Sequence, residues 1–138
     1  MSEETAPVTV LALLPSREEQ TGLRGIFQHS RWHLRLAETL EDGRGILGDA
    51  ATAVVIAARR LPDASWKDVL QEVQGRSIPL PLIVAARVAD DRLWSEVLNL
   101  GGYDVLSTPF QLVEVQRSVS LAWRHWRDTK GKTMVSAG

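Results

Sequence analysis

The chain has 138 residues, of which 44% are hydrophobic, and its formal net charge is −1. This size and composition suit one globular domain with its own core. The near-neutral charge gives no electrostatic reason to bind nucleic acid or an anionic membrane. The lack of cysteine excludes disulfides, a thiol nucleophile and cysteine-ligated metals. The apolar runs are too short to span a bilayer. Residues 1–7 are polar and acidic, unlike a signal peptide, so we predict a disordered N-terminus on a soluble cytoplasmic protein.

Five short apolar runs alternate with helical patterns along the chain. Most of the runs are apolar throughout, which is typical of strands buried on both faces; they lie at 8–14, 32–37, 53–58, 81–86 and 105–106. Helices are predicted between them, because a capping residue opens most of these segments and apolar residues recur at helical spacing. The predicted helices cover 16–30, 39–47, 65–74, 90–100 and 111–126.

Five strand–helix units in this length predict an α/β fold with one five-stranded parallel sheet. Parallel neighbours need right-handed crossovers, which place helices on both faces of the sheet. The flavodoxin-like (βα)5 arrangement, with strand order 2-1-3-4-5, suits this number of units. We assign residues 8–127 to this domain and predict that the polar residues 128–138 form a flexible tail.

The segment from Asn99 to Phe110 predicts how the fold closes. Gly101 suits a helix C-terminus in the left-handed region, and Pro109 ends the short strand because it has no N–H for a sheet ladder. The run resembles the "G-A-x-D-Y-L-x-K-P-F" closure of bacterial response-regulator receiver domains, which are CheY-like. The Leu61-Pro62-Asp63 loop and the order of elements add to the resemblance, which covers about residues 8 to 127.

The resemblance also implies which positions would carry the phosphorylation chemistry of the family, and none holds the expected residue. Apolar or hydroxyl side chains stand where the family has its acidic pair, its phosphoacceptor aspartate, its Thr or Ser, its switch aromatic and its lysine. Leu14 and Pro15 stand at the acidic pair, Ala58 at the phosphoacceptor aspartate, and Ala86 (Ala85 in the other register) at the Thr or Ser. Val105 stands at the switch aromatic and Thr108 at the lysine.

These replacements predict a pseudoreceiver that neither binds Mg²⁺ nor accepts a phosphoryl group. Mg²⁺ needs a shell of oxygen ligands, and aspartyl phosphorylation needs a carboxylate nucleophile. Leu14, Pro15 and Ala58 supply neither. Arg59 and Arg60 would add cationic repulsion if they face the pocket, and the sequence leaves open whether a small anion binds there instead.

Two alternatives remain for this site. Asp63 is the one carboxylate near the expected pocket and would be a displaced phosphoacceptor, although a turn or helix-capping role is the simpler interpretation. Ser16 would contact a phosphate at a helix N-terminus in a flavodoxin-like cofactor binder, against capping of its own helix with Glu19. The three histidines show no metal spacing, and we predict no metal site, no cofactor and no enzymatic activity.

The five tryptophans are many for a chain with two phenylalanines and one tyrosine. They either cover the ends of the core or mark a surface for a protein partner. The resemblance implies a homodimer through the fourth helix, fifth strand and fifth helix, where the predicted interaction face comprises Trp94, Leu98, Val105, Val113, Leu121 and Trp123. The basic residues late in the chain favour a helix C-terminus over nucleic-acid binding.

Together these observations predict a stand-alone degenerate receiver of a two-component phosphorelay system. It would act by protein–protein interaction, fixed in one state, because the switch residues are absent. A signal would then enter through a partner that binds one conformation better than another.

Overall fold

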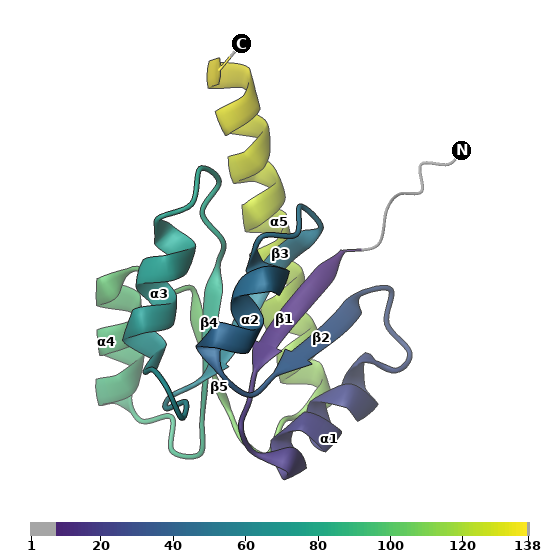
Figure 1. Ribbon diagram of the computed structural model, residues 1–138. Helices are drawn as coiled ribbons and strands as arrows, with labels where there is room; N and C mark the ends of the chain where they lie inside the picture. Colours follow the sequence, from purple (N-terminus) through teal and green to yellow (C-terminus); the bar gives the residue numbers. More distant parts are fainter. Residues whose placement is uncertain (1–7, 138) are drawn as a thin grey trace.

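The computed structural model describes residues 8–137, which form alternating strands and helices (Figure 1). The strands are β1 (Thr9–Leu13), β2 (His33–Ala37), β3 (Thr52–Ala58), β4 (Leu82–Ala86) and β5 (Asp104–Ser107). The helices are α1 (Arg17–Phe27), α2 (Leu40–Leu47), α3 (Trp66–Gln74), α4 (Asp91–Leu100) and α5 (Leu112–Ala137). All four strand pairs are parallel, and the order is β2-β1-β3-β4-β5. The predicted sheet, strand order and number of units are confirmed.

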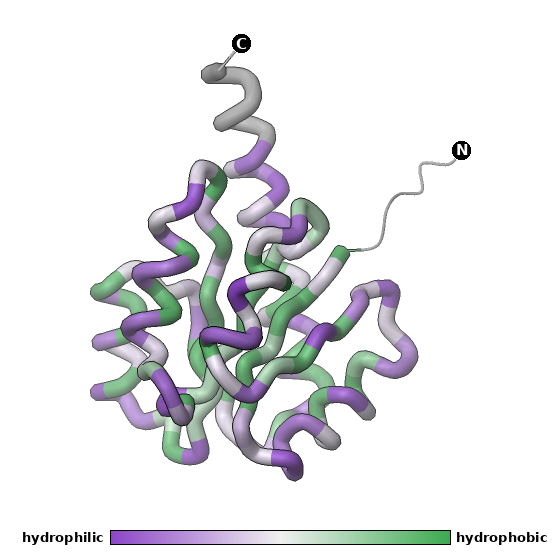
Figure 2. Tube along the Cα trace, in the orientation of Figure 1, coloured by the Kyte–Doolittle hydropathy of each residue, from purple (hydrophilic) through white to green (hydrophobic). Residues whose placement is uncertain are grey.

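Helices cover both faces of the sheet, because successive apolar side chains along the strands point to opposite faces and both faces must be buried. In β1, Leu11 and Leu13 pack with residues of α2, α3 and α4, whereas Val10 and Ala12 pack with residues of α1 and α5. The central strands are therefore apolar on both faces, and Figure 2 shows them as continuous hydrophobic tubes inside the fold. β2 is an edge strand and carries the exposed His33 and Arg35.

Side-chain caps begin the first four helices at the residues that the sequence predicts. Ser65 and Asp68 form a capping box at α3. The Ser65 hydroxyl accepts from the backbone of the first helical turn, and the Asp68 carboxylate accepts from the Ser65 N–H at 2.9 Å. Asp90 caps α4 by accepting from the Leu93 N–H at 2.9 Å, and Thr39 does the same for α2. At the end of α4, Gly101 has φ +107°, the left-handed conformation predicted for it.

The last helix is longer than predicted. From the sequence, the helix is predicted to end near Trp126, where its apolar stripe ends, and residues 128–138 are predicted to form a flexible tail. In the structure α5 is helical through Ala137. Two cation–aromatic pairs at i,i+4 spacing support the helix beyond the sheet: Arg127 lies over the Trp123 ring at 4.8 Å and Lys130 over the Trp126 ring at 4.7 Å. The predicted disordered N-terminus, residues 1–7, lies outside the described residues. Within 8–137, no helix is long and apolar enough to cross a membrane.

Candidate functional site

The carboxyl ends of β1, β3 and β4 meet at one edge of the sheet, where the loops that follow them enclose an open hollow (bottom of Figure 1). We call this the edge hollow. It has a volume of about 370 Å³ and is lined by Pro15, Ser16, Glu19, Ala58, Arg59, Arg60, Ala85, Ala86, Arg87 and Val88. In open α/β sheets, ligands bind at this edge near the point where the strand order reverses. The edge hollow is therefore the candidate functional site.

Only some of the sequence-predicted pocket positions line the edge hollow, and the side chains of those that do carry no oxygen. Pro15, Ala58 and Ala86 line the edge hollow, whereas Leu14 is fully buried and packs in the core between the sheet, α1 and α5. Thr108 is buried, and its N–H donates to the Ala86 carbonyl at 3.0 Å. Ala85 also lines the edge hollow, so both registers of the fourth strand give an alanine.

The resemblance to receiver domains implies a Mg²⁺ ion at this edge, and the residues present do not fit one. Mg²⁺ is held in proteins by carboxylate and other oxygen ligands. The apolar strand ends offer none, and the described part of the chain contains no group of three His, Cys, Asp or Glu side chains placed to hold a metal.

Asp63, the candidate displaced phosphoacceptor, caps a helix that is distant in sequence. Its two carboxylate oxygens accept hydrogen bonds from the backbone N–H groups of Leu40 and Glu41, both at 3.0 Å, at the start of α2. These two bonds lower the pKa of Asp63, because they stabilise the ionised carboxylate. The capping role preferred from the sequence is confirmed. The helix it caps is α2, which the sequence spacing did not reveal.

Ser16 is also engaged by the backbone. Its hydroxyl accepts from the Glu19 N–H at 3.3 Å and begins α1. The end of β1 is held beside it, because the Gln20 side-chain amide donates to the Leu14 carbonyl at 2.7 Å. Ser16 therefore acts as a helix cap, as expected from its pairing with Glu19.

Three arginines line the edge hollow. Arg59 and Arg60 follow β3, and Arg87 follows β4 in the same way. All three side chains are exposed, and none forms an ion pair with a carboxylate within residues 8–137. Only Arg59 and Arg60 are predicted at this pocket from the sequence. The signal for Arg87 was its position directly after a strand that neighbours β3 in the sheet.

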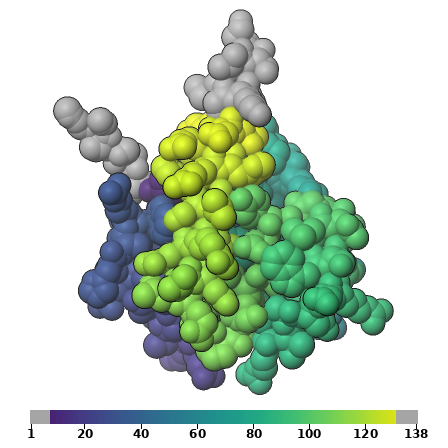
Figure 3. All heavy atoms as spheres, turned by 180° about the vertical axis from the view of Figure 1, so that it is seen from behind, coloured from purple at the N-terminus to yellow at the C-terminus, as the bar shows by residue number. Residues whose placement is uncertain are grey.

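A second feature is the apolar surface at the β5 edge. Trp94 and Leu98 lie one turn apart on α4 and are 38% and 45% exposed, and Leu121 on α5 is 45% exposed. On α4 the pair lies opposite the flank where Glu96 contacts Lys67 of α3. On α5, Leu121 lies near Ser118, whose hydroxyl donates to Asp104 of β5 at 2.5 Å. Figure 3 shows α5 and α4 side by side on this side of the molecule.

Three residues of the predicted interaction face do not belong to it. Val105 is 6% exposed and packs in the core with residues of α3 and α4, because side chains alternate between the two faces of the sheet along β5 and that of Val105 faces these helices. Trp123 is half-buried against the core cluster to which α1 contributes Leu23 and Phe27. It lies about 140° around α5 from Ser118. Val113 is exposed, but it points away from the sheet on the outer side of α5. The prediction is wrong for the buried Val105. Trp123 and Val113 lie on other sides of α5, and the exposed apolar residues that remain at this edge are Trp94, Leu98 and Leu121, which we call the β5-edge patch.

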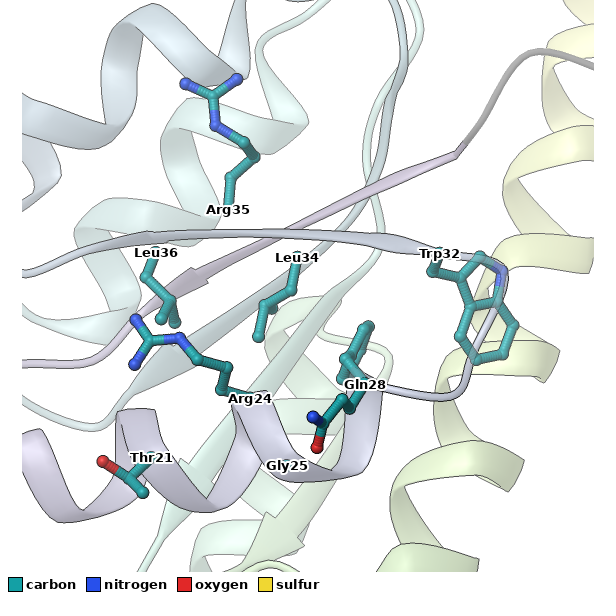
Figure 4. A pocket seen from close by; sticks show the side chains of 9 residues that line it. Thr21, Arg24, Gly25, Gln28, Trp32, Leu34, Arg35 and Leu36 are labelled. Atoms are coloured by element: carbon teal, nitrogen blue, oxygen red, sulfur yellow. The ribbon is translucent and has the colours of Figure 1, made fainter.

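Of the other tryptophans, Trp66 is buried in the core, while Trp32 and Trp126 pack partly buried against it. Trp32 also lines an open furrow of about 720 Å³ between α1 and β2 (Figure 4). Arg24 reaches over this furrow from α1, whereas Arg35 projects to the other side of β2. The furrow is lined by no carboxylate and no histidine, so it offers no acid–base pair.

No sequence-family model matches the chain, and no curated protein matches it in sequence. Its structure is nevertheless similar to many solved structures. The signal receiver domain of an HD domain-containing protein from Pseudomonas fluorescens Pf-5 has a TM-score of 0.83 at 18% identity, over 95% of this chain and 97% of that one. The signal receiver domain of a Luxo repressor protein from Vibrio parahaemolyticus has a TM-score of 0.79 at 22% identity, over 94% and 98%. The beryllofluoride-activated NtrC4 receiver domain dimer has a TM-score of 0.77 at 17% identity, over 86% and 98%.

These similarities, with the strand order and helix placement, define the class of fold. The chain has the CheY-like fold of response-regulator receiver domains, as the closure segment predicted. At these identities the likeness establishes the fold alone. What the chain does with the fold depends on the residues at its edge hollow and at its surface.

Proposed function

We propose that this chain is a degenerate receiver module that acts by protein–protein interaction in bacterial signal transduction, without Mg²⁺, aspartyl phosphorylation or enzymatic activity. The observation that carries the proposal is the chemistry of the edge hollow. Alanine and proline line it where the fold's chemistry requires carboxylates, and Leu14 belongs to the hydrophobic core. A receiver fold without these oxygens retains its surfaces but has no phosphoryl acceptor at the strand ends.

A phosphodonor experiment tests the proposal. The protein is incubated with acetyl phosphate and Mg²⁺, and its intact mass is measured, with a receiver that is known to accept phosphate treated in parallel. We expect no added phosphoryl group, and no change in tryptophan fluorescence when beryllofluoride and Mg²⁺ are titrated. A mass gain of one phosphoryl group would contradict the proposal.

The alternative of a displaced phosphoacceptor at Asp63 predicts that mass gain and its loss in Asp63→Asn. The structure gives this alternative little support, because both carboxylate oxygens of Asp63 already accept backbone hydrogen bonds. A flavodoxin-like cofactor binder predicts a coloured purified protein. The Ser16 hydroxyl, its candidate phosphate contact, caps α1 instead.

For the interaction surface we propose the β5-edge patch, in self-association through α4, β5 and α5. Tryptophan is enriched in the buried centres of protein interfaces and is among the residues that contribute most to binding there. The solved NtrC4 receiver domain is a dimer, which supports the proposal by analogy.

Solution mass measured by light scattering over a range of concentrations tests this surface. We expect wild type to dimerise and Trp94→Ala to shift it toward monomer. Val113→Ala is the matched control, because Val113 is exposed but lies outside the patch. Monomeric wild type, or equal effects of both substitutions, would remove the self-association proposal.

A further inference from the structure

The edge hollow combines an apolar floor with a cationic wall. Its floor consists of small side chains, including the methyl groups of Ala58, Ala85 and Ala86, which leave its volume of about 370 Å³ open. Its wall carries Arg59, Arg60 and Arg87. In Figure 2 the loops at this edge carry both hydrophilic and hydrophobic residues.

The arginines of this wall outnumber the carboxylates that line the edge hollow. Within the described part of the chain, Glu19 is the only carboxylate that lines the edge hollow. Several carboxylates on the adjoining loops and helices have other partners: the Leu40 and Glu41 N–H groups for Asp63, the Ser65 N–H for Asp68, the Leu93 N–H for Asp90, and the Lys67 ammonium for Glu96. Outside the edge hollow, Glu18 lines a neighbouring pocket with Arg87, and Asp90 and Glu96 line another with Arg59. The lining of the edge hollow itself therefore carries three arginines and one carboxylate.

The backbone beneath the arginines is held in place, although their side chains are exposed. The Arg59 N–H donates to the Ala85 carbonyl at 3.2 Å, and the Arg59 carbonyl accepts from the Trp66 N–H at 3.1 Å. Arg60 forms an antiparallel bridge with Ser65, which closes the β3–α3 loop. Because the β3 and β4 ends are paired in register through Ala58 and Ala85, the bases of all three arginines have fixed relative positions.

We propose that the edge hollow binds a small diphosphate-type anion, such as pyrophosphate or the phosphate chain of a nucleotide. Guanidinium groups present planar pairs of N–H donors that match phosphate oxygens, and they are the preferred side chains for such anions. The anion is bound without Mg²⁺, since the arginines supply the positive charge. This inference goes beyond the proposed interaction role and assigns a ligand class to the site where phosphorylation chemistry is missing.

Isothermal titration of the full chain with inorganic pyrophosphate, without added Mg²⁺, tests the proposal. We expect saturable one-to-one binding, weaker binding of orthophosphate, and a fall in affinity with added salt because the contacts are ionic. Arg59→Gln and Arg87→Gln are each expected to weaken binding about tenfold, since a charge-assisted hydrogen bond is worth roughly one such step. Adenosine triphosphate is titrated in a separate arm, and tighter binding than pyrophosphate would identify a nucleotide as the source of the anion.

Arg117→Gln is the matched control, because Arg117 is an exposed arginine on α5 outside the edge hollow. It should bind pyrophosphate as wild type does, and Arg60→Lys, which keeps the charge but loses the fork, should fall between wild type and Arg60→Gln. Thermal unfolding verifies that each variant is folded. Absence of pyrophosphate binding, an equal loss in Arg117→Gln, or a requirement for Mg²⁺ would overturn the inference. None of these results bears on phosphodonor labelling, so the two proposals fail separately.

Discussion

The strand ends and the helix starts at the same edge of the sheet are built from opposite kinds of residue. The strand ends carry Pro15, Ala58 and Ala86, which have no side-chain oxygen. The helix starts carry Ser16 and Asp90, whose side-chain oxygens accept backbone N–H groups of their own helices. Oxygen-bearing side chains at this edge therefore stabilise the fold, and their number alone says nothing about phosphate chemistry. The comparison can be tested by adding an oxygen to a strand end or removing one from a helix start.

The largest effect is expected at Leu14, where the family resemblance would place a carboxylate. Leu14→Asp should destabilise the protein by about 3–5 kcal/mol, because it buries an unpaired charge in a fully enclosed apolar site. Denaturant unfolding followed by circular dichroism measures the change. Leu14→Met, which conserves volume, should cost below about 1.5 kcal/mol. A folded Leu14→Asp protein of wild-type stability would show that this position opens to solvent and that the core assignment is wrong.

The turn after α4 gives the next largest effect. Gly101 has φ +107°, and an added Cβ would lie 2.3 Å from the Gln74 side-chain nitrogen, which donates to the Leu100 carbonyl. Gly101→Ala should therefore cost about 1–2 kcal/mol through left-handed strain and displacement of Gln74.

Gly25→Ala is the matched control for this turn. Gly25 lies within α1, and nothing is within 4 Å of an added Cβ. This substitution should stabilise the protein by about 0.5–1 kcal/mol, because it lowers the entropy of the unfolded chain and raises helix propensity. Denaturant midpoints of the two variants should thus move in opposite directions. A shift of both in the same direction would contradict the left-handed assignment of Gly101.

Removal of an oxygen from a helix start is expected to have a smaller, pH-dependent effect. Asp63→Ala should lower the melting temperature by exposing two unpaired N–H groups of α2, and Asp63→Asn, which keeps one acceptor, should lower it less. The pKa of Asp63 is lowered in the folded state, so its ionised form contributes stability above the unfolded pKa of about 3.9, and this is lost as pH falls through the folded pKa. Melting temperatures should differ between wild type and Asp63→Ala at about pH 7, and they should differ less at an acidic pH below the unfolded pKa of about 3.9. A constant difference at both pH values would show that charge plays no part in this cap.

Local patterns in the sequence were sufficient to predict the architecture. Apolar runs, the Ser65–Asp68 capping box and Gly101 each specify a local conformation, and together they imply the observed sheet. The proline and alanines of the edge hollow also followed from the strand ends, but Leu14, predicted beside them, lies in the core, and Arg87 was missed. Long-range partnerships did not: the hydrogen bonds from Leu40 and Glu41 to Asp63 span more than twenty residues of sequence.

The predicted interaction face failed for a related reason. Val105 and Trp123 were assigned from their place in the fifth strand and helix, without the rotation that decides which side each presents. A helix turns about 100° per residue, so of two apolar residues close in sequence, one can face the core and the other the surface. Leu121 and Trp123, only two positions apart, illustrate this.

The smallest change in stability is expected when a carboxylate is added at a strand end. Ala58 ends β3 beside Arg59 and Arg60 and is only partly buried, so Ala58→Asp should alter the free energy of unfolding by no more than about 0.5 kcal/mol. It should still gain no phosphoryl group from acetyl phosphate, because Leu14 and Pro15 supply no ligand for Mg²⁺. Intact mass after treatment measures this, with wild type as the reference. A phosphorylated Ala58→Asp protein would mean that a nucleophile alone is missing, and that the arginines of the edge hollow serve the phosphoryl group in place of a metal ion.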